Sequence, residues 1–97
     1  MPYRIYSGED DAEYRSALAA AAENALVLNF ASGSGNLVYH DPSCSHVGGG
    51  GRDPPNGGSW TNDSKVIGSS LRELREGAEK ICGRPVGRLR PCCHYSP

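Results

Sequence analysis

The chain has 97 residues, a net charge of −1 and a hydrophobic content of 37%, which together are typical of a single domain with a modest core. The near-neutral charge argues against a generic nucleic-acid binder, and no stretch approaches the roughly 20 apolar residues that a membrane span requires. Because the N-terminus lacks a charged start followed by an apolar segment, we expect a cytoplasmic protein without a membrane partner.

Charge is distributed unevenly along the sequence. Residues 1–63 carry three basic and eight acidic side chains, whereas residues 64–97 carry seven basic and three acidic ones. This asymmetry indicates either a basic surface that meets nucleic acid or an acidic protein, or an intramolecular match between the two parts of the chain. The residues that we expect to contact phosphate are Arg84, Arg88 and Arg90.

Residues 1–24 predict a strand followed by a helix. Residues 3–6 alternate as a strand does, and their terminal position favours the edge of a sheet. Ser7 stands three residues before Asp10, as in a capping box, and the alanine-rich segment 11–24 reads as a helix with acids in its first turn. Its apolar positions recur every three or four residues, so we expect one face to pack on a sheet.

The middle of the chain predicts a hairpin and then a loop. Residues 25–30 and 37–40 are short apolar runs separated by a Gly- and Ser-rich turn, which is the pattern of two paired strands. Residues 47–59 are dominated by Gly, Pro and polar residues, a composition that predicts a flexible loop with no part in the core. This loop lacks the Gly-Lys-Ser/Thr ending of a phosphate-binding loop.

The last third predicts one more strand and a second helix. Residues 65–67 read as a strand, and Ser70 with Glu73 forms a capping box. The helix is expected to end near Cys82, because Gly83 follows and supplies a C-terminal stop. Cys82 lies on the apolar face of this helix, so we interpret it as a small core residue.

These elements predict one α+β domain over residues 1–97, in which a small antiparallel sheet of three to four strands is flanked by two helices. Residues 1–24 supply the N-terminal strand and helix, and residues 25–97 form a module rich in His and Cys. Trp60, the one tryptophan, is interpreted as a lid over the core rather than a binding platform. A zinc-knuckle-like site is expected to join the hairpin to the C-terminal tail.

The clearest chemistry lies at His40 and Cys44, which follow the second strand of the hairpin. Residues 41–43 read Asp-Pro-Ser, a turn that brings Cys44 back beside His40. Thiols stay reduced in the cytoplasm, so clustered Cys and His indicate metal ligands more than disulfide partners. Zn²⁺ binds four tetrahedral ligands drawn from thiolate and imidazole, so this pair predicts half of a zinc site.

The other half is expected at Cys92-Cys93-His94. Side chains of adjacent residues diverge in an extended backbone, whereas those two residues apart lie on one side of it. The preferred ligand set is therefore His40, Cys44, Cys92 and His94. Cys93 competes for the fourth place, and His46 is a spare histidine that we expect to be exposed to solvent.

The motifs resemble a group of small bacterial modules whose pattern runs His-x3-Cys, a Trp, a Lys-Val-Cys strand, a helix and a final Pro-Cys-x-x-Cys. The matching positions are residues 39–46, Trp60-Thr61, Lys65-Val66, the helix from Ser70 and Pro91-Cys92. More distantly, the hairpin, helix and closing cysteines are similar to the zinc-binding domain of Ada-type DNA-repair regulators and to modules appended to bacterial nucleases.

The resemblance implies a zinc site but departs from the pattern at two positions. Ile67 stands in place of the Lys-Val-Cys cysteine, and Tyr95 stands in place of the last cysteine. The pattern therefore retains three ligands, His40, Cys44 and Cys92, and the fourth comes from Cys93 or His94.

The function favoured by the sequence is a non-enzymatic, zinc-stabilised binding module that contacts nucleic acid or an acidic protein. One alternative is a metal-free structural or interaction protein with a disulfide or packed cysteines. A second is an enzyme that uses a metal-bound thiolate or an open metal site. The enzyme is less favoured because no Glu or Asp is placed as an obvious general base beside His40 and Cys44. Asp41 is the nearest acid, and it reads as a turn residue.

Overall fold

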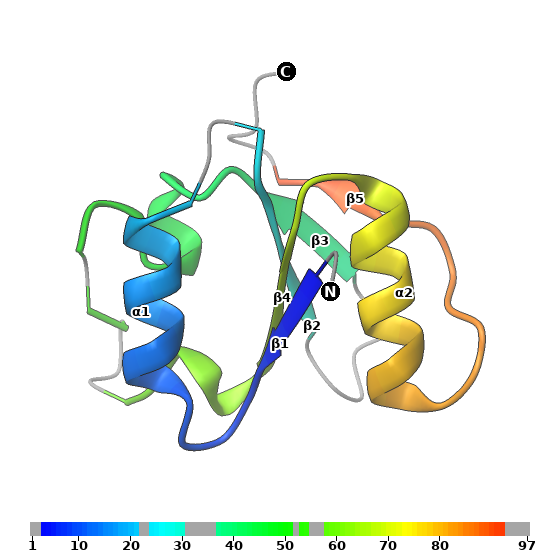
Figure 1. The fold of residues 1–97 in the computed structure, drawn as a ribbon, viewed down its shortest axis with the longest axis horizontal. Coiled ribbons are helices and arrows are strands. Elements are labelled where there is room, and N and C mark those ends of the chain that lie inside the picture. The colour runs from blue at the N-terminus through cyan, green and yellow to red at the C-terminus, as the bar shows by residue number, and fades with distance from the viewer. Residues whose placement is uncertain (1–2, 22–23, 31–36, 52, 55–57, 93–97) are drawn as a thin grey trace.

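Within the residues that the structure describes, which are 3–21, 24–30, 37–51, 53–54 and 58–92, the computed structural model contains two helices and five strands (Figure 1). The elements are β1 (Tyr3–Tyr6), α1 (Asp11–Ala19), β2 (Leu26–Phe30), β3 (Leu37–His40), β4 (Ser64–Gly68), α2 (Leu71–Cys82) and β5 (Arg90–Pro91). Three single-turn 3₁₀ helices, η1 (Ser45–Val47), η2 (Gly49–Gly51) and η3 (Trp60–Asn62), lie between β3 and β4.

The strands form one sheet in the order β1-β4-β2-β3-β5. The pairs β1 with β4, β4 with β2, and β2 with β3 are antiparallel, whereas β3 and β5 are parallel. The α+β class, the β2–β3 hairpin and the edge position of β1 are as the sequence predicts. The sheet gains one strand, β5, beyond the three to four expected.

The two helices lie on opposite sides of the sheet (Figure 1). Paired residues point to the same face, so Val27, His40 and Ile67 share the face under α1. The buried core on that side consists of Tyr6, Tyr14, Leu18, Val27, Val47 and Trp60. The core under α2 consists of Leu28, Leu37, Val66, Leu74, Ala78 and Leu89.

Helix α2 forms where its capping signals predict it. Ser70 is the N-cap residue and its hydroxyl accepts a hydrogen bond from the amide of Glu73 at 3.2 Å. The Glu73 carboxylate reaches back to the amide of Ser69 at 2.7 Å. Gly83 ends the helix in a left-handed conformation with φ of 72°, which glycine adopts at little cost. Leu71, the first residue of the helix, is 44% exposed.

Helix α1 is shorter than the sequence suggests. It was expected to reach residue 24, but it ends at Ala19, where the amide of Ala21 donates to the carbonyl of Leu18 in a tightened last turn. Leu18 is the last α1 residue in the core, and the chain must then turn to enter β2. Helix propensity is a local property of the sequence and does not indicate where the chain must turn into the next strand.

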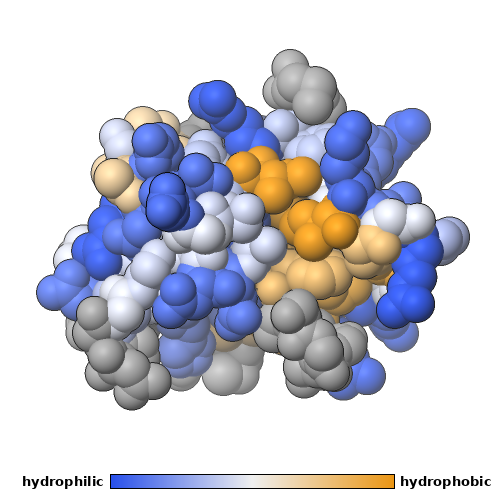
Figure 2. Space-filling model, turned by 90° about the horizontal axis from the view of Figure 1, so that it is seen from below, coloured by the Kyte–Doolittle hydropathy of each residue, from blue (hydrophilic) through white to orange (hydrophobic). Residues whose placement is uncertain are grey.

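The sheet and its two helices leave some apolar surface exposed to solvent. Viewed from below, the molecule shows a patch of hydrophobic residues within a mainly hydrophilic surface (Figure 2). Partly buried residues that pack against the α2-side core include Ile5, Phe30 and Ile81. The helix α2 therefore covers its side of the sheet incompletely.

Candidate metal centre

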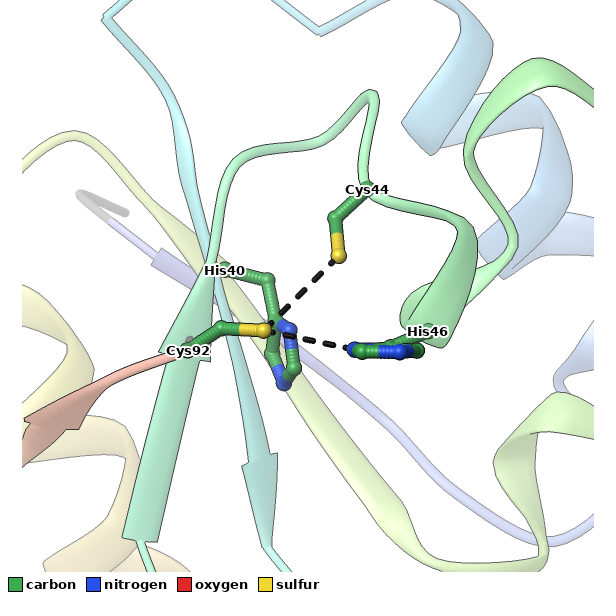
Figure 3. A group of neighbouring side chains, drawn as sticks. All are labelled: His40, Cys44, His46 and Cys92. Carbon is green, nitrogen blue, oxygen red and sulfur yellow. Dashed lines mark hydrogen bonds between the residues drawn. The ribbon is translucent and has the colours of Figure 1, made fainter. Parts of the chain in front are cut away.

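Four side chains from two stretches of the chain, residues 40–46 and the end of β5, converge at one end of β3 (Figure 3). They are His40, Cys44, His46 and Cys92, and their ligand atoms all lie within 4.8 Å of one another. His40 ends β3, Cys44 follows the next turn, His46 lies in η1, and Cys92 comes directly after β5. This His₂Cys₂ group can hold a metal ion.

The turn that carries Cys44 is built by Asp41. The Asp41 carboxylate accepts a hydrogen bond from the amide of Ser43 at 2.9 Å and another from the Ser43 hydroxyl. The Asp41 carbonyl accepts from the amide of Cys44 at 2.9 Å. These bonds reverse the chain after β3, which is how an Asp-Pro-Ser sequence commonly turns. The predicted turn is therefore present and brings Cys44 back toward His40.

The chain then winds closely around Cys44, in a segment that we call the knuckle (residues 40–49). The Cys44 carbonyl accepts hydrogen bonds from the amides of Val47 at 3.2 Å and Gly49 at 2.8 Å. A Cβ placed on Gly49 would meet the backbone carbonyl of Ser43 and would lie 2.7 Å from the amide nitrogen of Cys44. Only glycine fits this crossing, because the two backbone segments are in contact.

The beginning of the glycine-rich loop belongs to the core, contrary to its composition. Val47 is fully buried, and its carbonyl accepts a hydrogen bond from the hydroxyl of Tyr14. Gly48, with φ of 98°, lies against the indole of Trp60, where a Cβ would be 2.9 Å from Nε1. Glycines in this segment permit close packing, whereas the sequence interpretation took them only as a sign of flexibility.

Cys92 reaches the site because β5 pairs with β3. Arg90 lies beside Val38 and Pro91 beside Tyr39, and the amide of Cys92 donates to the carbonyl of Tyr39 at 2.8 Å. Leu89, which immediately precedes β5, is buried in the α2-side core and anchors the segment. The sequence does not reveal β5, because a two-residue strand that contains proline carries no alternating pattern.

Two distances within the cluster are close to those of a tetrahedral zinc site. The two sulfurs lie 4.0 Å apart, and Nδ1 of His46 lies 3.3 Å from Sγ of Cys92. Ligands bound to one tetrahedral zinc ion would place two sulfurs about 3.8 Å apart and a sulfur and a nitrogen about 3.5 Å apart. The imidazole rings of His40 and His46 meet edge to face, with centroids 6.1 Å apart.

His40 is held in the protonation state that binds metal. Its side chain is 6% exposed, and burial lowers its pKa to about 4, with smaller contributions from the nearby His46 and Lys65. The imidazole is therefore neutral at pH 7. Its Nδ1 is buried and has no hydrogen-bond partner among the described residues. Leaving such an atom unsatisfied costs about 1–3 kcal/mol, a penalty that coordination of an ion would remove.

The structure brings together three of the four expected ligands, His40, Cys44 and Cys92. His94 and its competitor Cys93 lie outside the described residues. His46 is exposed, as expected of a spare histidine, yet its ring nitrogen faces Cys92 within the cluster. The sequence places His46 two residues after Cys44, but this spacing alone does not show that η1 turns the His46 ring toward Cys92.

The remaining predicted residues lie outside the cluster. Arg84, Arg88 and Arg90 are exposed. Trp60 is buried in the core under α1, in agreement with its interpretation as a core lid. Cys82 lies on α2, across the sheet from the cluster; it is half-buried and donates a hydrogen bond to the carbonyl of Arg84 at 3.1 Å.

One buried charge was not anticipated. Lys65 is 4% exposed on β4, and its ammonium donates to the carbonyls of Trp60 at 2.7 Å and Asp63 at 3.2 Å. Burial lowers its pKa, and Asp63 opposes that shift. Lys65 thus holds η3 against the sheet.

Comparisons with family models, curated proteins and solved structures found no match to this chain. Among the described residues, neither helix has the length and apolar character needed to traverse a bilayer.

Proposed function

We propose that this protein is a zinc-stabilised binding module, in which one ion held by His40, Cys44, His46 and Cys92 fastens the C-terminal segment to the central hairpin. The observation that carries the proposal is the convergence of four ligand atoms within 4.8 Å from segments far apart in sequence. Two thiolates and two imidazoles are a ligand set that suits Zn²⁺ and disfavours Mg²⁺ or Ca²⁺.

The number of ligands supports a structural role rather than a hydrolytic one. Catalytic zinc sites keep a position open for water, whereas structural sites are closed by four protein ligands. With His46 in the fourth place, all four positions are filled by the chain. Asp41, the acid closest in sequence, uses its carboxylate to build the turn through Ser43. These features support a stabilising ion over an active-site metal.

The fold also supplies a reason for the ion. β5 contributes only two residues to the sheet, and the chain positions that the ion would join, Cys44 and Cys92, are 48 apart. A domain of this size has a limited core, so a metal staple adds stability where the strand pairing is weakest.

The binding surface that we propose is the exposed basic stretch leading into the site. Arg88 and Arg90 flank the buried Leu89, so the segment is anchored while both guanidinium groups face solvent. Arg75 on α2 donates to the carbonyls of Val86 and Gly87 and holds the same segment. Guanidinium groups on an anchored backbone suit the phosphates of nucleic acid, with an acidic protein as the alternative partner.

Metal content tests the zinc site. We expect about one zinc per chain by elemental analysis of protein purified without a histidine tag. Co²⁺ substitution should produce the strong visible absorption of a tetrahedral site with thiolate ligands. Cys44→Ser and Cys92→Ser should each lose the metal, whereas Cys82→Ser, a matched change on α2, should keep it. Absence of metal from the wild-type protein, or its retention in Cys44→Ser, would reject the site.

Salt-dependent binding tests the proposed partner. Wild-type protein and an Arg88→Ala/Arg90→Ala variant are titrated with a single-stranded and a duplex oligonucleotide at several salt concentrations. Loss of two phosphate contacts should weaken binding and reduce the slope of log K against log salt by about 2. Arg72→Ala, on the exposed surface of α2 beside Glu76, is the control. If wild-type protein binds neither oligonucleotide, nucleic acid is excluded as the partner while the zinc site stands.

A further inference from the structure

Cys44 and Cys92 are placed to react with each other as well as to hold an ion. Their sulfurs are 4.0 Å apart, and in Figure 3 the two side chains approach each other from the knuckle and from the end of β5. A disulfide has a sulfur–sulfur distance of about 2.05 Å, so closing the bond requires a movement of about 2 Å. Both sulfurs stand on side chains that can rotate about the Cα–Cβ bond, and the backbone pairing of β5 with β3 does not depend on these rotations.

We propose that Cys44 and Cys92 form a redox pair that responds to peroxide: oxidation joins them in a disulfide and releases zinc, and reduction by thiols restores the zinc-binding form. The inference rests on the proposed zinc site and adds a means of regulating it. Hydrogen peroxide is the oxidant, and a dithiol or glutathione is the reductant.

The chemistry balances in two steps. The Cys44 thiolate attacks one peroxide oxygen, the O–O bond breaks, and hydroxide leaves, which gives a sulfenic acid on Cys44. The Cys92 thiolate then attacks the Cys44 sulfur, the S–O bond breaks, and a second hydroxide leaves. Two protons convert both hydroxides to water. The sulfurs lose two electrons to the peroxide. Zn²⁺ keeps its oxidation state and departs because a disulfide is a poor ligand.

Exposure assigns the order of attack. Cys44 is half-buried, and the exposed His46 lies beside it at the solvent side of the cluster, whereas Cys92 is 6% exposed. Peroxide therefore reaches Cys44 first, and Cys92 acts as the resolving thiol. Sulfenic acids form on accessible thiolates that stand next to a second cysteine, and this pair meets both conditions.

The oxidised form keeps the link that the ion provided. Both the ion and the disulfide tie the knuckle to the residue after β5, so the basic segment carrying Arg88 and Arg90 stays attached to the sheet. The two imidazoles, in contrast, lose their metal. Oxidation should therefore change the state of the site without unfolding the domain.

The experiment uses the full chain loaded with zinc. Increasing amounts of hydrogen peroxide are added, zinc release is followed with a coloured chelator, and disulfides are mapped by peptide mass spectrometry. We expect about one zinc released per disulfide formed, a Cys44–Cys92 linkage, and rebinding of zinc after reduction. A cyclic diketone added early should label Cys44 rather than Cys92. Cys82→Ser and Cys93→Ser should release zinc as the wild-type protein does.

Two results would overturn the proposal. One is a disulfide that involves Cys82 or Cys93 in place of the Cys44–Cys92 bond. The other is zinc that stays bound, or is lost irreversibly, as peroxide is consumed. Failure of the zinc site itself is distinguished beforehand, because elemental analysis of the untreated protein measures the metal without peroxide. Zinc-loaded protein that does not form the bond rejects only the redox pair, whereas protein without zinc rejects both proposals.

Discussion

The two histidines of the site differ in exposure, and the exposed one occupies the position for which another ligand can compete. His40 is fixed at the end of β3 and buried, whereas His46 is exposed on a single 3₁₀ turn. In the proposed site, His46 would therefore complete the coordination from the solvent side. The fourth ligand preferred from the sequence is instead His94, two residues after Cys92, with Cys93 as its competitor.

Paired substitutions identify the fourth ligand. We expect His46→Gln to weaken zinc affinity by more than about 100-fold, because even changes to residues that only support a ligand cost 10–100-fold. His94→Gln should leave the affinity unchanged. Competition titrations with a chelator of known zinc affinity measure both variants. The reverse pattern would assign the fourth place to His94.

Gly49 is the residue on which the backbone crossing of the knuckle depends. Gly49→Ala should destabilise the protein by about 2–4 kcal/mol, because the new methyl group would overlap the backbone of Ser43 and Cys44 and force the turn open. Gly87→Ala is the control, since a Cβ at Gly87 meets nothing within 4 Å. Urea unfolding midpoints measure both changes. Equal stability of the two variants would mean that the two backbone segments are not in contact at the crossing.

At the scale of the element, the turn that carries Cys44 is centred on Asp41. Asp41 makes its hydrogen bonds to Ser43 and Cys44 within the chain. Asp41→Ala should therefore lower zinc affinity by about 10-fold, in the range for residues that orient ligands. Asp41→Asn keeps an acceptor oxygen and should lose less. If neither variant changes the affinity, the ion itself imposes the turn.

Elements with local signals could be predicted from the sequence, whereas those that depend on distant partners could not. α2 was located because its caps, Ser70 and Gly83, lie beside it in the chain. The turn at Asp41 was found for the same reason. The sequence carries no sign of β5, because this strand exists only through pairing with β3. It does not show the packed start of the glycine loop either, because Gly48 packs there only against Trp60.

The same distinction applies to the metal centre. His40 and Cys44 are four residues apart and were paired from their spacing, and Cys92 was joined to them by its chemistry. The position of His46 could not be derived in this way, because it depends on how η1 winds after Cys44. His46 lies in the cluster although it is exposed, so exposure alone was an insufficient criterion for excluding a ligand.

At the scale of the whole molecule, the sheet carries two cores, and the metal centre touches only one of them. Cys44 packs against the core under α1, while the core under α2 is composed of residues from the sheet, α2 and Leu89. Removal of the ion should therefore loosen β5 and the part of the knuckle after Asp41, but leave α2 and the β1-β4-β2-β3 sheet, which includes His40, folded. Stability of the zinc-free protein can then be measured as a function of pH.

Stability of this zinc-free form should fall as the pH is lowered from about 6.5 to about 4. The pKa of His40 is lowered in the folded state from 6.5 to about 4, mainly by burial. Between these values the unfolded chain binds a proton at His40 that the folded chain does not, so acid favours unfolding. Well above pH 6.5 neither state is protonated at this residue, and its contribution is constant.

The control for this pH dependence is His40→Gln, which removes the titrating group while keeping a polar side chain. Urea midpoints of the zinc-free wild type and variant are compared across the same pH range, and the difference between them isolates His40 from the carboxylates that titrate nearby. The wild-type protein should show the steeper loss of stability. Parallel curves would mean that His40 is accessible to protons in the folded state. The interpretation of His40 as a buried, neutral imidazole that is ready to bind metal would then be wrong.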